Sequence, residues 1–500
     1  MRPRFVRAAL PVVLLWLWAR PAPAQESARR ADRFDPVRAA IRRVMDSTGV
    51  PAIAVALAQN GRITWEEGFR WADREKRVPA TEHTMFSLAS ISKPITATGL
   101  MRMVEEGKVD LDAPANRYLG LGKLTGLGGD ADQATVRRVM SHTAGLPLHY
   151  TFYYAGLDYG EPTMDEAIAR YGIVVYPPGQ AYQYSNLGYG IVDHIIERVS
   201  GVPYADYLRT RVFAPLGLTR MSVHVGPGLE PYVAQRYDPQ LRPIPFYDFD
   251  HDGGSAVWAS AHDLVRFGMF HLKERLPDQQ RILADSTIDL MHRSATPPSA
   301  GGEYGLGWGS VNEFGFRRVN HTGGMPGVAT ILAIYPSERT AVVVLANQAA
   351  TPYERILQEI LSVAFPLRYA DSLRLRRAQP PRLAETPRFT PPAELAGEWT
   401  GTLRTWQRTL RFKLTFQPDG DVQAQVGDNA PALVNGARWA NGVLTGRFTG
   451  TISTPDASRH RHSVLLQLRL LDGKLKGQAS AQTTDEPVYF ALTSYVELGK

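Results

Sequence analysis

The sequence predicts an α+β fold, in which helices flank an antiparallel sheet and form an inserted helical subdomain, followed by a small all-β domain. Three observations predict it. Strand-like runs stand near both ends of residues 25–368, helices and Gly/Pro-rich loops fill the middle of that region, and apolar–polar alternation becomes regular after residue 393. We therefore expect sequence-distant strands to close one sheet, with helices on its faces.

Length, composition and charge limit the classes of function. The chain has 500 residues, which predicts two or three domains, and 44% apolar with 21% charged residues, which predicts a packed core. The formal charge of +7 falls to +3 without the four arginines of residues 1–24, and no long basic run remains, so no nucleic-acid partner is expected. The absence of cysteine excludes cysteine nucleophiles and thiolate zinc sites.

Residues 1–24 are typical of a cleavable signal peptide. An arginine-rich start precedes an apolar run at 8–19, and small residues occupy positions 22–24. The apolar run is shorter than the ~20 residues that cross a bilayer, although a retained N-terminal anchor is the alternative. We expect cleavage near Ala24-Gln25, a secreted or periplasmic protein, and no transmembrane segment in the mature chain.

The first domain, residues 25–368, begins with an expected helix at 35–45, where apolar residues recur every third or fourth position. Two strands follow at 52–59 and 63–70. The Asn60-Gly61 dipeptide between them favours a tight hairpin. Further helices are expected at 90–104, 187–199 and 353–364, and further strands at 327–335 and 340–346.

A Pro- and Arg-rich linker is expected at 369–392, and an all-β domain at 393–500. Apolar residues alternate with polar ones before turns, as at Leu410, Phe412, Leu414 and Phe416. This period of two predicts a small barrel or sandwich. We find no catalytic constellation in this domain, and the sequence leaves its role open.

Ser90-Ile91-Ser92-Lys93 is the strongest candidate for a nucleophile and its base. Residues three apart on a helix share one face, so the two polar side chains can touch. A serine hydroxyl needs a proton acceptor, and a lysine can serve when apolar surroundings lower its pKa toward neutrality. The helix start also offers backbone N–H groups to an oxyanion. Alone, the motif is weak evidence, and a helix start beside a solvated lysine is the alternative interpretation.

Two later segments add candidate residues. Tyr184 follows a Pro-Pro-Gly loop and is expected to relay or accept a proton, while Asn186 offers an amide that can both donate and accept. His321-Thr322-Gly323-Gly324 stands just before an expected strand, where glycines let a substrate approach closely and the Gly324 N–H can supply a second oxyanion donor beside that of Ser90. A buried tyrosine and an incidental glycine turn are the alternative interpretations.

With these motifs in order, S-x-x-K, Y-x-N and H-T-G, the chain resembles the serine β-lactamase and penicillin-recognising hydrolase superfamily. The branch that it is most similar to holds class C β-lactamases, D,D-carboxypeptidases, D-aminopeptidases and family VIII esterases. The likeness extends over roughly residues 35–367. Three further segments match sequences that are typical of that superfamily: Pro51 to Val55, Ser141 to Leu146, and Tyr304 to Trp308.

The resemblance implies an acyl-enzyme on Ser90, with Lys93 and Tyr184 sharing the proton transfers. It implies that Asn186 holds this network and, with residues 321–324, binds substrate. Which of Lys93 and Tyr184 is the first base stays open. The resemblance also implies that a C-terminal β-barrel can border the active site.

One departure concerns His321, because β-lactamases of this class typically carry lysine there. A histidine near its ordinary pKa is mostly neutral at pH 7 and attracts a substrate carboxylate less. We therefore expect a peptidase or carboxyl esterase acting on small or D-amino-acid-containing substrates. The alternatives are a class C-type β-lactamase and a non-catalytic penicillin-binding or scaffold protein.

No metal or cofactor is expected. Residues 248–253 imitate the start of a calcium loop, but Ala259 stands where the loop needs glutamate. His142 and His149 are interpreted as hydrogen-bonded structural residues. The expected partner is a small-molecule or peptide substrate, and self-association through the C-terminal domain is compatible with the sequence.

Overall fold

The computed structural model describes residues 32–297, 303–313, 315–377, 389–483 and 488–500. The expected signal peptide and its cleavage point lie outside these residues, as does segment 378–388 of the expected linker. Across the described residues, every helix falls short of the length and apolarity that crossing a membrane requires.

The first domain is built on one antiparallel sheet whose strands come from distant parts of the sequence, as the separated strand-like runs predict. The strand order is β11-β12-β13-β14-β15-β1-β2-β3, so strands from both ends of the domain meet where β15 pairs with β1. The strands are β1 (Ala52–Gln59), β2 (Arg62–Asp73), β3 (Val78–Pro79), β11 (Glu303–Tyr304), β12 (Gly309–Glu313), β13 (Phe316–Met325), β14 (Val328–Tyr335) and β15 (Thr340–Ala346).

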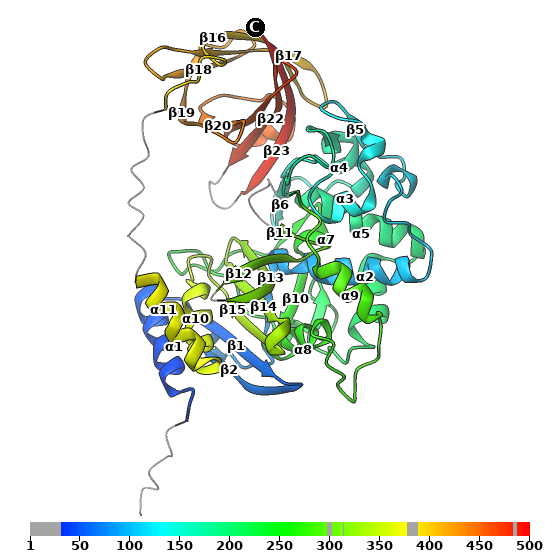
Figure 1. Cartoon of the computed structure of the whole chain (residues 1–500), viewed down its shortest axis with the longest axis vertical. Helices are drawn as coiled ribbons and strands as arrows, with labels where there is room; N and C mark the ends of the chain where they lie inside the picture. Colours follow the sequence, from blue (N-terminus) through cyan, green and yellow to red (C-terminus); the bar gives the residue numbers. More distant parts are fainter. Residues whose placement is uncertain (1–31, 298–302, 314, 378–388, 484–487) are drawn as a thin grey trace, which may run out of the picture.

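Helices cover both faces of this sheet (Figure 1). Strand β1 explains how, because its large side chains Ile53, Val55 and Leu57 belong to the core beneath α1 and α10, whereas the alanines between them face the main core. Small side chains let α8 pack closely on that second face. These helices are α1 (Asp35–Thr48), α8 (Ala261–His271), α10 (Tyr353–Ala364) and α11 (Pro366–Arg377). Helix α11 extends into the start of the expected linker.

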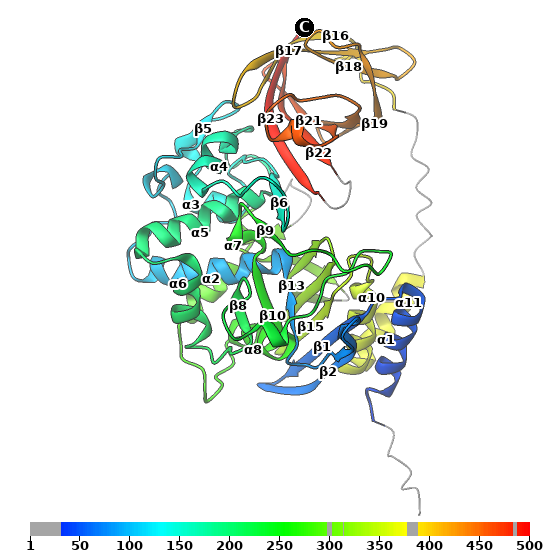
Figure 2. The ribbon, with the colours of Figure 1, turned by 180° about the vertical axis from the view of Figure 1, so that it is seen from behind.

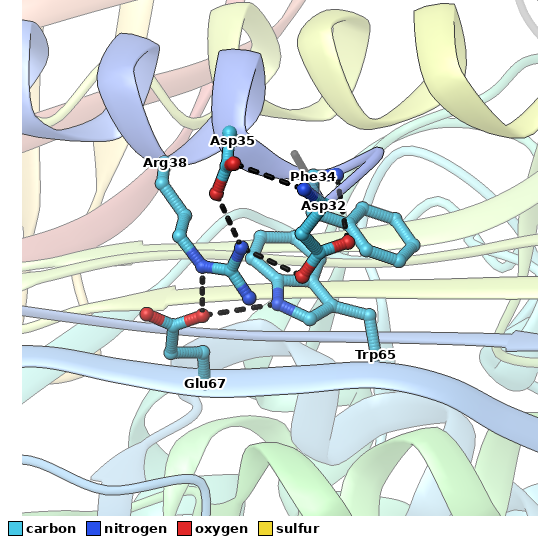
Figure 3. A network of polar contacts seen from close by, with 6 residues as sticks. All are labelled: Asp32, Phe34, Asp35, Arg38, Trp65 and Glu67. Carbon is cyan, nitrogen blue, oxygen red and sulfur yellow. Dashed lines mark hydrogen bonds and ion pairs between the residues drawn. The ribbon is translucent and has the colours of Figure 1, made fainter. Parts of the chain in front are cut away.

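A polar network anchors the start of α1 to β2 (Figure 3). The Arg38 guanidinium donates to Glu67 at 2.6 Å and to Asp32 at 2.8 Å, and the Trp65 indole donates to the same Glu67 oxygen at 3.1 Å. The Trp65 ring stacks on Phe34 with centroids 4.7 Å apart. These contacts fix the outer helix layer on the face of the sheet opposite α8.

A helical subdomain lies between β4 and β11 in sequence and beside the sheet in space (Figure 1). Its helices are α2 (Ser92–Glu105), α3 (Val136–Met140), α4 (Met164–Tyr171), α5 (Asn186–Ser200), α6 (Tyr204–Leu208), α7 (Asp252–Ser255) and α9 (Asp285–His292). Short strands complete it: β4 (Met85–Ser87), β8 (Met221–Val223) and β10 (Val257–Ser260) form one sheet, β5 (Thr125–Gly126) pairs with β7 (Ile173–Val174), and β6 (Tyr150–Tyr154) pairs with β9 (Tyr247–Phe249).

The C-terminal region is a closed eight-stranded barrel, which the period-two pattern predicted. Its strands pair in sequence order, and β23 returns to pair with β16. Phe412, Leu414 and Phe416 are buried inside it, as their alternation requires. The strands are β16 (Gly397–Arg404), β17 (Thr409–Phe416), β18 (Val422–Val426), β19 (Ala432–Ala440), β20 (Val443–Phe448), β21 (Ser463–Leu471), β22 (Lys474–Thr483) and β23 (Phe490–Gly499).

The barrel is joined to the first domain by backbone pairing as well as by the chain itself. Strand β23 pairs with β6, with Phe490 opposite Thr151, and β6 in turn pairs with β9. Both views show the barrel standing over the subdomain at β6 and α4 (Figure 1, Figure 2). The Tyr159 hydroxyl lies 2.8 Å from His460 Nε2 across this junction. This pairing carries the barrel to the rim of the pocket described next.

Candidate active site

A pocket of about 500 Å³ lies between the sheet, the subdomain and the barrel. It contains several of the candidate residues together with aromatic and aliphatic side chains. Its lining is Ser90, Leu148, Tyr150, Phe152, Tyr184, Asn186, His251, Ser255, Gly324, Met325, Pro326, Val328, Ala349 and Tyr489. All described lining residues lack a permanent charge.

Ser90 stands on a sharp turn between β4 and α2. The expected helix 90–104 divides there into a 3₁₀ turn, Ala89–Ile91, and α2 proper. Ala89 has a φ of 49°, in the left-handed region that a residue with a Cβ seldom adopts, at a cost of about 1 kcal/mol. The Leu88 N–H donates to the Val257 carbonyl at 2.9 Å, which ties the turn to β10. The turn presents Ser90 to the pocket while Lys93 stays beneath it.

Lys93 is completely buried, and three groups surround its amine. Its Nζ lies 3.1 Å from Ser90 Oγ, 2.8 Å from Asn186 Oδ1 and 3.0 Å from the Gly254 carbonyl oxygen. No carboxylate of the described residues forms an ion pair with it. A neutral amine suits this arrangement, because two N–H groups can donate to the carbonyl oxygens while the lone pair accepts the Ser90 proton.

Burial lowers the pKa of Lys93 well below its ordinary value. Burial also raises the pKa of Tyr184, so the phenol keeps its proton. The Tyr184 hydroxyl donates to Ser90 Oγ at 2.9 Å, and its ring lies 4.9 Å from Lys93 Nζ. The phenol thus lies near a buried amine whose pKa is lowered, and burial favours the protonated form of the phenol.

The loop before α5 is held by its own hydrogen bonds. Ser185 caps the helix by accepting from the Gly188 N–H at 2.9 Å, and its own N–H donates to His142 Nδ1 at 3.2 Å. The His142 ring packs against Tyr184, with centroids 4.3 Å apart. Burial, with Lys93 and His321 nearby, lowers the pKa of His142 well below its usual value, so this neutral imidazole acts as a structural support.

His321, expected near the substrate, points into the protein instead. It belongs to β13 itself, and its Nδ1–H donates to the Thr322 carbonyl at 2.8 Å. Its Nε2 accepts from the Tyr304 hydroxyl at 3.0 Å. Burial and the nearby Lys93 lower its pKa to about 3. A neutral, doubly bonded imidazole offers no charge to a substrate carboxylate, which agrees with the expectation from the sequence.

Residues 322–324 lie side by side on β13 but have different surroundings. Strand alternation places Thr322 on the face opposite His321, where its hydroxyl interacts with Tyr353 of α10 rather than with the pocket. The structure thus places the Thr322 side chain outside the pocket lining. A Cβ on Gly323 would lie 2.0 Å from the Leu88 carbonyl oxygen, so this glycine lets β13 approach the turn that carries Ser90.

Gly324 lines the pocket, and its Cβ position is open. Met325 pairs with Val328 beside a two-residue turn, so alternate residues such as Gly324 direct their N–H groups away from β14. This register leaves the Gly324 N–H available at the pocket, as an oxyanion donor requires.

Sequence reasoning missed several residues at this site. Gly254 supplies a carbonyl to Lys93, and His251 lines the pocket from the segment that was interpreted only as a failed calcium loop. Tyr489 enters from the barrel, and its carbonyl accepts from the Phe152 N–H at 3.1 Å. A local pattern could have indicated His251, flanked as it is by Asp250 and Asp252, but not Tyr489.

Known proteins resemble this chain in two ways. By sequence, it is 28% identical over 332 residues to penicillin-binding protein 4* of Bacillus subtilis, covering 61% of this chain and 70% of that protein. It is also 28% identical over 328 residues to an unguisins hydrolase of Aspergillus campestris, covering 61% of this chain but only 60% of that relative's length. By fold, it is similar to the octameric penicillin-binding protein homologue of Pyrococcus abyssi, with a TM-score of 0.55, 21% identity, and coverage of 91% of this chain and 99% of the other.

The family assignment rests on a sequence profile described as Beta-lactamase, which matches residues 37–365. That range contains the sheet, the subdomain, and the residues Ser90, Lys93, Tyr184 and Asn186. With the motifs, the fold and the profile in agreement, the chain belongs to the beta-lactamase family of serine hydrolases.

Proposed function

We propose that this protein hydrolyses an uncharged carboxyl ester or peptide amide through an acyl-enzyme on Ser90. One observation carries the proposal: the Ser90 hydroxyl lies within 3.1 Å of a buried amine and 2.9 Å of a protonated phenol. A nucleophile, a proton acceptor and a proton donor thus meet in one pocket.

In acylation, Lys93 accepts the Ser90 proton as Oγ attacks the substrate carbonyl. Its lowered pKa makes the amine neutral and available, whereas the raised pKa of Tyr184 favours the phenol as donor. The backbone N–H groups of Ser90 and Gly324 hold the oxyanion. Tyr184 then protonates the leaving oxygen or nitrogen and recovers a proton from Lys93. Asn186 keeps the amine in place through its Oδ1.

The lining of the pocket supports an apolar acyl group as substrate. Tyr150, Phe152 and Tyr489 form an aromatic wall, and the described lining offers no cation for a carboxylate. The neutral His321 supplies none either. For these reasons we place a peptidase or esterase activity before β-lactam hydrolysis.

The test compares rates on a short-chain nitrophenyl ester, a D-alanyl peptide and a cephalosporin. Wild type should turn over the ester or peptide fastest. Ser90→Ala should lower kcat by about 10⁴-fold or more on every substrate, because the covalent route is lost. Mass spectrometry should detect an acyl adduct on Ser90 of wild type alone. Equal activity of the two proteins would refute the mechanism, and a preference for the cephalosporin would refute the substrate class.

We also propose that the protein is exported after cleavage near Ala24-Gln25. The support is the arginine-rich start and the apolar run of residues 1–24. Fractionation of expressing cells, with N-terminal sequencing of the mature chain, tests this proposal directly. An intact N-terminus in the cytoplasmic fraction contradicts it.

A further inference from the structure

Beside the pocket lies a line of three buried side chains that the proposed acylation does not use. Asp250 accepts at both carboxylate oxygens, from His149 Nε2 at 2.7 Å and from His251 Nδ1 at 2.8 Å. All three residues are at most 4% exposed. His251 alone among them lines the pocket that holds Ser90.

The hydrogen bonds determine which ring nitrogen of His251 carries the proton. An ionised carboxylate only accepts, so Nδ1 of His251 carries the proton and Nε2 keeps its lone pair. Within the described part of the chain, that Nε2 has no hydrogen-bond partner. Although burial opposes it, the two imidazoles hold the pKa of Asp250 below its ordinary value, so the carboxylate stays charged. Burial lowers the pKa of His251, although the hydrogen bond and charge of Asp250 raise it, and the net lowering favours a neutral imidazole.

The position of His251 relates it to the reacting groups. A Cβ placed on Gly254 would stand 3.0 Å from His251 Cδ2 and 3.5 Å from Lys93 Nζ. The imidazole and the amine therefore flank one small gap at Gly254. Lys93 faces Ser90 from this gap, while His251 forms part of the pocket lining and keeps its Nε2 buried. A carboxylate that orients an imidazole, with the second nitrogen free, is the arrangement of a general base in a serine hydrolase triad.

We propose that His251, oriented by Asp250, is the general base that activates water for hydrolysis of the Ser90 acyl-enzyme. This inference rests on the proposed function. Nε2 takes one proton from water as the water oxygen bonds to the ester carbon. The bond between that carbon and Ser90 Oγ then breaks, and Tyr184 gives its proton to Oγ. The proton on His251 returns to the Tyr184 oxygen through solvent, so the carboxylic acid is the only product and each residue regains its starting state.

This division of labour gives acylation and deacylation different bases, which kinetics can separate. His251→Gln should keep the first-turnover burst on a nitrophenyl ester near the wild-type rate. Its steady-state kcat should fall by about 10²-fold or more, the usual contribution of a general base. Mass spectrometry should then find the acyl-Ser90 adduct accumulating during turnover. Asp250→Asn, which alters one atom of the orienting group, should change the same ratio in the same direction.

A matched control is His224→Gln. His224 is also held by two carboxylates, Asp248 at 2.9 Å and Asp252 at 2.8 Å, but it does not line the pocket. Its substitution should leave the ratio of burst rate to steady-state rate unchanged. Circular dichroism shows whether each variant folds. If His251→Gln does not fold, the ratio of burst rate to steady-state rate in Asp250→Asn decides the question.

Three outcomes overturn the inference. The first is an equal fall of burst and steady-state rates in His251→Gln, the second is a kcat that stays at the wild-type value, and the third is a fall in kcat without an adduct. A wild type that forms no adduct on Ser90 instead refutes the proposed function. The two failures are thus distinguished by one set of measurements.

Discussion

The floor and the rim of the pocket are built in different ways. The floor consists of Ser90, Lys93 and Tyr184, in which the amine and the phenol both lie within hydrogen-bond distance of Ser90 Oγ, at 3.1 and 2.9 Å. The rim contains Tyr150, Phe152 and Tyr489, which meet because a barrel strand pairs with β6. The floor determines which chemistry is available, whereas the rim determines which acyl group fits. The two regions should therefore respond differently to mutation: floor variants should lose rate, and rim variants should lose substrate affinity.

The largest effect is expected at the floor. Lys93→Met removes the proton acceptor but keeps a side chain of similar length, so kcat should fall about 10³-fold or more. In wild type, kcat/KM should rise with pH and level off well below the ordinary lysine pKa, because burial has lowered that of Lys93. The sign follows from the neutral base: activity is present above the lowered pKa and lost as pH falls through it. Steady-state rates across the pH range measure both the fall of kcat in Lys93→Met and the pH dependence of kcat/KM in wild type.

The control for Lys93 is Lys76→Met, at an exposed residue paired with Asp73 on the surface. It should leave both kcat and the pH profile unchanged. An acid limb that persists unaltered in residual Lys93→Met activity would show that another group is responsible for it.

The same contrast explains what the sequence could predict. Ser90 and Lys93 are three residues apart, so helix geometry alone brings them together, and the motif order adds Tyr184 and Asn186. The sheet was predictable from strand-like runs near both ends of the first domain, and the burial of Phe412 and Leu414 from the period-two pattern of the barrel. All of these features depend on local spacing.

Features that depend on tertiary pairing could not be predicted. Phe490 lies opposite Thr151, far away in the sequence, and no residue near either one indicates the pairing. His251 stands in an acidic run, and only the fold shows that Asp250 faces two imidazoles rather than a cation. The motif groups Thr322 with its neighbours as a substrate-binding residue, but strand alternation turns its side chain to the far side of the sheet.

A smaller effect is expected at His321, whose buried imidazole lies near Lys93. His321→Lys places an amine where a neutral imidazole now bonds Tyr304. The kcat/KM for a carboxylate-bearing cephalosporin should rise about tenfold relative to that for a neutral ester, equivalent to ~1.4 kcal/mol. His321→Gln, which adds no charge, should not change this ratio. If both variants change kcat/KM for the two substrates by the same factor, a charge at position 321 does not contribute to carboxylate recognition.

The smallest effect is expected at the rim. Tyr489→Ala removes one aromatic side chain from the pocket wall and leaves Ser90, Lys93 and Tyr184 in place. Loss of its apolar contact should raise KM for an aromatic acyl ester about 3- to 10-fold, matching the ~1 kcal/mol that such contacts contribute, with kcat nearly constant. Leu433→Ala, at an exposed site of the same barrel, is the matched control and should change neither constant. A fall in kcat at constant KM would instead mean that the barrel acts on the floor, and the separation of chemistry from fit would then be wrong.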